Sequence, residues 1–149
     1  MAEQSAITAG HKPGTSVQDL QNQWSKRASL LNNGPVLSCA AMANSKVTKK
    51  QWRAPFKGRM LAALCTSSNT AAASSALVDI NNITQSNAML AAPEEISGFT
   101  LNTQTALTPN ATAANLEFEV GDIIEVSWTT DGSGTVADSQ VQLAIEPRD

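Results

Sequence analysis

The sequence predicts an all-β fold, an antiparallel β-sandwich of the jelly-roll-like kind, over residues 46–149. Three observations lead to this prediction. From about residue 46 onward, apolar and polar residues alternate with a period of two, which is typical of strands with one face on a core. Turn-forming Pro and Gly residues separate the short runs, and no helical pattern falls among them. The 149 residues suffice for one domain and an arm, so residues 1–45 are assigned to an extended N-terminal arm.

One short amphipathic helix is expected in this arm, over about residues 17–31. Residues 16–19, Ser-Val-Gln-Asp, resemble a capping box with an acid in its last position. The apolar residues that follow at helical spacing are Val17, Leu20, Trp24, Ala28 and Leu31. The sequence Asn-Asn-Gly-Pro at 32–35 then ends the helix. We expect the apolar stripe to dock on a neighbouring protein, and packing against its own domain is the alternative.

Four alternating runs supply most of the expected core. They lie near residues 78–80, 116–120, 124–128 and 141–145, and in the second of them Leu116, Phe118 and Val120 alternate with two glutamates. Because alternate side chains of a strand point to opposite faces, one set in each run faces the core. The expected core residues are Met60, Leu64, Val78, Ile80, Leu116, Phe118, Ile124, Val126, Trp128, Leu143 and Ile145.

The run from Gly58 to Cys65 is apolar on both faces. Such a pattern predicts a central strand, covered by the second sheet on one side and by the arm or a neighbour on the other. The two cysteines, Cys39 and Cys65, are interpreted as small buried hydrophobes, because two thiols in 149 residues are far below the density of a disulfide scaffold. A disulfide between them stays possible.

The charges are divided along the chain. Nine of the ten Lys and Arg residues fall in the first 60 positions, whereas eleven of the thirteen acids lie after position 78. A charge asymmetry between two halves is one of the few features of composition that bear on partners. It suggests that the basic part meets acidic protein, either a sister subunit or the surface of an assembly.

Eight of the ten basic residues fall within a stretch of 34 residues, from Lys26 to Arg59, that contains no acid. The partner-binding residues expected in and after the arm are Val17, Leu20, Trp24, Leu31, Lys46, Lys49, Lys50, Arg53, Lys57 and Arg59. Nucleic acid is an unlikely partner, since the chain as a whole is acidic with a pI near 5.1, although Trp52 is free to stack on a base. Scattered solubilising lysines are the remaining interpretation.

No catalytic or metal-binding arrangement is recognisable, so we expect no enzymatic activity and no cofactor. The only histidine, His11, lies in the arm, away from every plausible nucleophile. The acids from Glu117 to Glu125 are interpreted as a solvated acidic face, and Asp131 with its glycines as a hairpin turn rather than a calcium loop. No apolar run is long enough to cross a membrane, and residues 1–10 hold no secretory signal. The protein is therefore expected to stay in a cytoplasm or to leave it inside an assembly.

Three segments give the chain a family resemblance. They are Pro-Phe-Lys-Gly-Arg-Met-Leu at 55–61, Leu-Val-Asp-Ile-Asn-Asn at 77–82 and Phe-Glu-Val-Gly-Asp-Ile-Ile-Glu-Val at 118–126. Over residues 52–147 the chain resembles the small β-sandwich proteins that tailed bacteriophages carry on their particles, such as capsid decoration (cement) proteins and head fibres. The resemblance implies a structural role without catalytic residues, and often a trimer.

Three functions are then compatible with the sequence. The first is a non-enzymatic virion protein, assembled in the host cytoplasm, that binds the major capsid protein or another virion protein through its arm and decorates or stabilises the capsid. The second is a receptor- or carbohydrate-binding module of a tail or fibre, which the shortage of aromatic residues disfavours. The third is a small jelly-roll capsid protein whose basic arm contacts nucleic acid.

Overall fold

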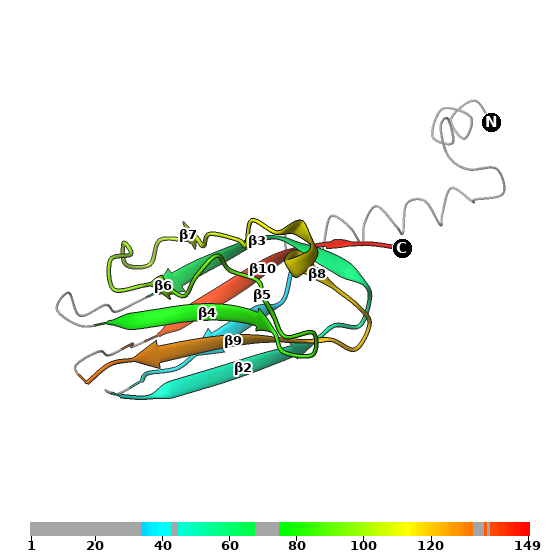
Figure 1. Ribbon diagram of the computed structural model, residues 1–149. Coiled ribbons are helices and arrows are strands. Elements are labelled where there is room, and N and C mark those ends of the chain that lie inside the picture. The colour runs from blue at the N-terminus through cyan, green and yellow to red at the C-terminus, as the bar shows by residue number, and fades with distance from the viewer. Residues whose placement is uncertain (1–33, 43–44, 68–74, 133–135, 137) are drawn as a thin grey trace, which may run out of the picture.

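In a computed structural model the chain forms two antiparallel sheets packed face to face (Figure 1). The structure describes residues 34–42, 45–67, 75–132, 136 and 138–149. The helix expected over residues 17–31, with Val17, Leu20, Trp24 and Leu31, lies outside them. The first sheet contains β1 (Val36–Cys39), β10 (Ser139–Pro147), β3 (Gly58–Ser67), β7 (Thr105–Ala106) and β8 (Glu117–Phe118). The second sheet contains β2 (Val47–Arg53), β9 (Ile123–Thr130), β4 (Ala76–Asn82), β5 (Asn87–Ala88) and β6 (Glu94–Glu95).

The strand pairing is nested from the ends of the chain inward. β1 pairs with β10, β2 with β9, β3 with β7 and β8, and β4 with β5 and β6. The strands of each outer pair thus enclose all those of the inner pairs, which is the topology of a jelly roll. The predicted fold class, an all-β jelly-roll-like sandwich, is confirmed.

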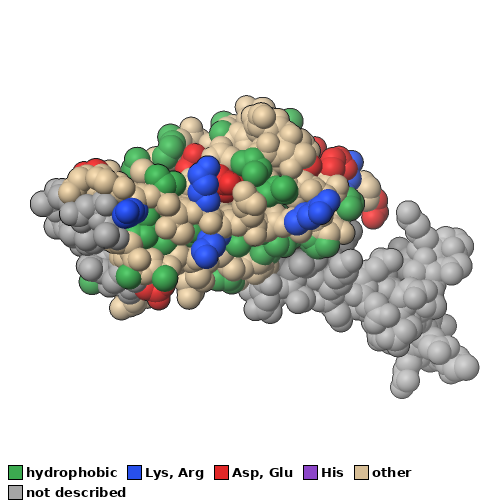
Figure 2. All heavy atoms as spheres, turned by 90° about the horizontal axis from the view of Figure 1, so that it is seen from below, with side chains coloured by type: hydrophobic (Ala, Val, Ile, Leu, Met, Phe, Trp, Pro, Cys, Tyr) green, Lys and Arg blue, Asp and Glu red, His purple; other side chains and the backbone are tan. Residues whose placement is uncertain are grey.

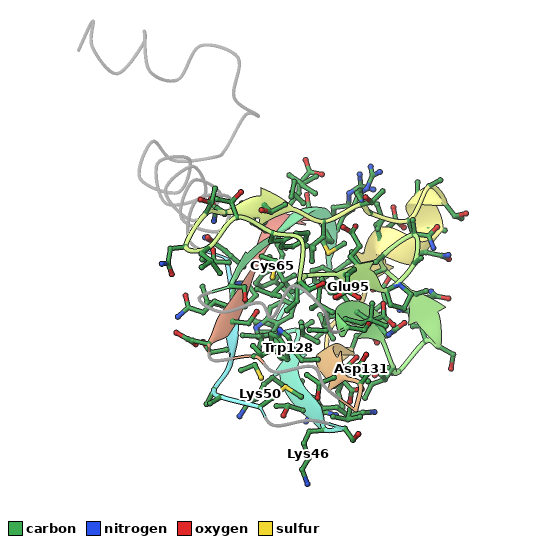
Figure 3. All side chains as sticks on the ribbon, turned by 90° about the vertical axis from the view of Figure 1, so that its left-hand side faces the viewer. Lys46, Lys50, Cys65, Glu95, Trp128 and Asp131 are labelled. Carbon is green, nitrogen blue, oxygen red and sulfur yellow. The ribbon has the colours of Figure 1, made fainter. Side chains whose placement is uncertain are left out.

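The core lies between the two sheets and is centred on Trp128 of β9, which Figure 3 shows between the two layers. The indole Nε1 of Trp128 donates a hydrogen bond to the Ser139 hydroxyl across the core, at 3.0 Å. Ten of the eleven expected core residues are buried, all except Leu64. The long connection after β4 adds buried side chains that the sequence analysis did not predict: Met89, Leu90, Ile96 and Leu107.

A β-bulge in β3 explains why Leu64 is not in the core. Met60 pairs with Ile145 and Ala62 with Ala144, so one extra residue, Leu61, stands between the two pairs. An extra residue shifts the alternation by one position. Side chains from Ala63 onward therefore face the core at odd positions, and Leu64 is half-buried on the outer side.

The run 116–120 is not the single alternating strand that the sequence predicts. Leu116 ends a 3-10 helix, η1 (Ala113–Leu116), and only Glu117 and Phe118 form a strand, β8. Val120 is 69% exposed in the turn that follows. Gly121 has φ +90 there, a conformation that residues other than glycine rarely adopt.

The sandwich begins ten residues earlier than the sequence analysis places it. β1 lies within the segment assigned to the arm, yet Val36 pairs with Gln142 and Cys39 with Ser139. The run 36–39 is too short and mixed to show a period of two, so the pattern could not reveal it. Both cysteines are free and fully buried, as expected of small hydrophobes. Burial raises the pKa of the Cys39 and Cys65 thiols.

Candidate partner-binding surface

The candidate surface is the edge of the second sheet formed by β2, with Lys46 just before it. Among the described residues β2 pairs on one side only, with β9. Lys46, Lys49, Lys50 and Arg53 therefore lie along a sheet edge. Figure 2, seen from the side on which β2 lies in Figure 1, shows Lys and Arg side chains spread along this face rather than gathered in one patch.

Alternation along β2 divides these residues between two directions. Trp52 and Thr48 pair with the inward-facing Ile124 and Trp128, so Lys50 between them points toward the inner side of the sandwich. The charge of Lys50 and a hydrogen bond from Thr48 act on the Cys39 thiol of β1, where they partly oppose the effect of burial on its pKa. Lys49 and Arg53 lie on the outer face instead.

Two of the predicted basic residues form ion pairs within the same domain. Lys49 Nζ lies 2.9 Å from Glu125 Oε1, and Lys57 Nζ lies 3.0 Å from Glu119 Oε1. Glu125 also accepts a hydrogen bond from Gln51 Nε2 at 2.8 Å. This bond and that from Lys49 hold the pKa of Glu125 below its ordinary value. Part of the charge that the sequence assigns to an external partner is thus neutralised internally.

Arg59 lies apart from the others, on the outer side of the first sheet. Its neighbours in the register are Glu146 of β10 and Glu117 of β8. Both acids contact Arg148, at 2.8 Å from Glu117 and 3.5 Å from Glu146. The Nε of Arg59 is buried and has no hydrogen-bond partner within the part of the chain that the structure describes. The structure therefore does not bring Arg59 into the surface formed by β2.

Lys46, Lys50 and Arg53 remain without an ion pair among the described residues. All three are exposed, and Figure 3 shows Lys46 pointing away from the sandwich. We call these three residues together with strand β2 the basic edge. A strand edge and three cations that have no partner among the described residues can bind the main chain and the carboxylates of an extended acidic segment.

The predicted solvated acidic face is wrong for two of its members, because Asp122 and Glu125 are buried. Asp122 Oδ2 accepts hydrogen bonds from Asn82 Nδ2 at 2.8 Å, from the main-chain N–H of Glu119 at 2.9 Å and from Gln85 Nε2. An aspartate that accepts such bonds fixes a turn. The Gly-Asp pair at the end of the turn was the available sequence signal for this role.

Trp52 is not the free ring that the sequence analysis expected. It is half-buried and forms edge-to-face contacts with Phe118 and Phe56, with ring centroids 5.5 and 6.1 Å apart. Its pairing with the inward-facing Ile124 placed it on the core side of β2. Trp52 is therefore part of the packing at this edge rather than a platform for base stacking.

The remaining acids near the Asp131 turn hold local structure. Asp131 Oδ2 accepts a hydrogen bond from the Ser75 N–H at 3.0 Å, and the Asp131 N–H donates to the Ser75 carbonyl at 3.1 Å. Glu95 is partly desolvated, which raises its pKa, but hydrogen bonds from Ser75, Ser97 and Ala76 outweigh this and lower it overall. Within the described ranges no three His, Cys, Asp or Glu side chains gather as metal ligands, and no helix is long and apolar enough to cross a membrane.

Comparison with known proteins gives no match to a family model, to a curated protein or to a solved structure. The basic edge and the jelly-roll fold are thus the observations from which a function is argued.

Proposed function

We propose that this protein is a non-enzymatic structural virion protein that decorates or stabilises a bacteriophage capsid. Its partner is the major capsid protein or another virion protein, and its working state is a homo-oligomer, with a trimer favoured by the family resemblance. The single observation that carries the proposal is the basic edge, where Lys46, Lys50 and Arg53 lack an acidic partner among the described residues.

The basic edge fits an acidic protein surface better than a nucleic acid. Its cations are few and lie beside Glu125 and the Lys49 ion pair. Phosphate backbones attract dense clusters of Lys and Arg, and single-strand binding adds stacked aromatic rings. Trp52 packs inward. A protein partner that offers carboxylates and an extended segment would pair both with these charges and with the edge of β2 that no described strand covers.

The segment before β1 supplies a second component of attachment. The apolar residues Val17, Leu20, Trp24 and Leu31 repeat at helical spacing, and an apolar stripe binds through burial rather than through charge. Attachment should therefore combine an ionic part and an apolar part. Salt shortens the Debye length from about 10 Å at 0.1 M to about 3 Å at 1 M, so only the ionic part should weaken.

The test measures binding to particles that lack this protein, across a salt series, for three proteins and a matched control. The first is the full chain and the second is residues 34–149, which retain β1. The third carries Lys46→Gln and Arg53→Gln. A matched control, Lys57→Gln with Arg148→Gln, removes the same charge from residues that already have acidic partners. We expect weaker binding at 0.1 M salt for the Lys46 and Arg53 variant, about tenfold, and unchanged binding for the control.

Three results would contradict the proposal. Full attachment by residues 34–149 would remove the N-terminal segment from the interface and would favour a receptor-binding module. Tight binding to bare DNA or RNA, with a steep linear fall of log affinity against log salt, would favour the nucleic-acid alternative. Equal weakening in the control would mean that the net charge, rather than the basic edge, governs attachment.

A further inference from the structure

The outer face of the first sheet is apolar and uncharged over its middle. Val36 of β1 is 51% exposed and Leu61 of β3 is 44% exposed. Ala62, Leu64 and Ala144 are half-buried beside them. We call these five residues the apolar face.

The strand register shows that the apolar face is continuous. One row across the sheet reads Val36, Gln142, Leu64 and Ala106, in strands β1, β10, β3 and β7. In the next row Ala144 pairs with Ala62, and the bulge turns Leu61 outward beside them. The charged residues of this side, Arg59, Glu117 and Glu146, all lie at one end of the sheet. Two alanines paired between leucines leave room for a large side chain from a covering element.

The chain itself supplies an element of the right kind. Thirty-three residues precede the first described residue, Gly34, and they include the predicted helix over 17–31 with its apolar stripe. This segment joins the domain at β1, the edge strand of the same sheet that carries the apolar face. The Pro35 carbonyl accepts a hydrogen bond from the Leu143 N–H at 3.0 Å, so the chain leaves the sheet just before Pro35.

The distances allow the segment to reach the apolar face. Three residues, 32–34, connect the predicted helix to Pro35 and span up to roughly 10 Å. Strands in a sheet are about 4.8 Å apart, so β3 lies roughly 10 Å from β1 with β10 between them. A helix of 15 residues is about 22 Å long, which is enough to cross four strands.

We propose that residues 17–31 of the same chain pack as a helix on the apolar face, with Trp24 over the paired alanines Ala62 and Ala144. The contact would bury the predicted apolar stripe against a sheet face that no described residue covers, and so form a third layer on the sandwich. This inference concerns the free protein and does not rest on the proposed function. If this inference and the proposed function both hold, the apolar stripe leaves the apolar face of its own domain and binds the particle when the protein attaches.

The test is amide hydrogen exchange of residues 17–31 in the free full-length protein. Docking predicts that these amides exchange at least about tenfold more slowly than in an unfolded segment. Leu61→Glu places a charge on the apolar face and should remove this protection. Trp24→Ala should do the same without touching the sandwich. The matched control is Val47→Glu, which changes another exposed apolar residue, 58% exposed, in the second sheet, and should leave protection intact.

Two outcomes would overturn the proposal. The first is unprotected amides over residues 17–31 in the full chain, or protection that survives Leu61→Glu. The second is protection that appears only with rising protein concentration, together with sedimentation as a dimer or trimer, because the occupant would then be the segment of a second copy. Neither measurement uses particles, so it can fail or succeed independently of the attachment experiment.

Discussion

The outer faces of the two sheets differ in how many of their side chains find partners among the described residues. On the second sheet, Lys49 and Gln51 of β2 both contact Glu125 of the neighbouring β9, and Glu125 is buried. On the first sheet, Leu61 and Val36 stay exposed, and their neighbours are alanines and uncharged polar residues. The second sheet thus carries a bonded polar cluster on its outer face, beside one exposed apolar side chain, Val47, whereas the first sheet exposes a continuous apolar surface over its middle.

This difference shows why the charge division along the sequence does not become a division in space. β2 is basic and β9 contains Glu125, and the two are more than 70 residues apart in the chain. The nested jelly-roll pairing places them side by side, so a basic strand meets an acid of its own domain. A partner is then indicated by the few charges that stay unpaired, and by apolar residues that stay exposed, rather than by the total in each half.

The largest predicted effect is on the core that both sheets share. Phe118 is 1% exposed and contacts Trp52 edge to face, so Phe118→Ala should lower the free energy of unfolding by about 3–5 kcal/mol. Denaturant unfolding of residues 34–149 measures it. The control is Val120→Ala, two residues along the same predicted run but 69% exposed, which should change stability by less than about 0.5 kcal/mol. Equal effects at both positions would contradict the boundary of β8.

A smaller loss is expected where the two ends of β3 and β8 approach. A Cβ on Gly58 would lie 2.6 Å from the Phe118 ring and 2.9 Å from the Glu146 carbonyl oxygen. Gly58→Ala should therefore force these neighbours apart and destabilise the domain by about 1–3 kcal/mol. Gly98→Ala serves as the control, because nothing lies within 4 Å of its Cβ position. A thermal unfolding series that ranks the two variants the other way would contradict this packing.

The third prediction sharpens the contrast in charge between the two faces. The pKa of Glu125 is lowered below its ordinary value of 4.5, so its pairing stabilises the protein above that pH, and the contribution is lost as pH falls through the lowered pKa. Glu125→Gln should cost about 1 kcal/mol at pH 7 and should flatten the loss of stability below about pH 4.5. Glu95, whose pKa is also lowered, is unchanged in this variant and should still contribute to the loss of stability as pH falls.

Unfolding at several pH values between about 3 and 7 measures the third prediction. Lys49→Met is the companion variant, because it removes the ion pair but leaves the Gln51 hydrogen bond. Its pH dependence should lie between those of the wild type and Glu125→Gln. If Glu125→Gln loses as much stability between about pH 7 and pH 3 as the wild type does, the pairing of Glu125 makes no contribution to the acid dependence.

Much of the fold could be predicted because a period of two reports directly which face of a strand is buried. That reasoning placed Trp128, Ile124 and Ile145 correctly in the core. It failed at Leu64, where the bulge at Leu61 shifts the alternation, because no residue in the run marks a bulge. It also missed β1, whose four residues are held by pairing with β10 rather than by a pattern of their own.

The candidate site was predictable only as a set of residue types. Lys49 and Lys57 form ion pairs with acids from distant parts of the chain, and Arg59 lies in the other sheet from β2. Their surroundings therefore depend on strand order and not on local sequence. The same holds for Asp122, whose three donors come from residues 82, 85 and 119. A single sequence carries no record of such long-range pairing unless a topology is assumed first.

The smallest expected effect on stability, but a clear one on association, comes from Lys50. It is an exposed cation on the inner side of an edge strand, opposite Val126, and an inward-pointing charge at a sheet edge disfavours pairing by a strand that offers it no acid. Lys50→Val would extend the apolar inner surface to the edge of β2. We expect the free energy of unfolding to change by less than about 0.5 kcal/mol, whereas sedimentation should show concentration-dependent self-association stronger than that of the wild type. Lys46→Val removes the same charge just before the strand, where no edge is opened, and should leave the sedimentation profile unchanged. Association in both variants would assign the effect to net charge, and association in neither would show that the twist of β2 and the remaining charges protect this edge without Lys50.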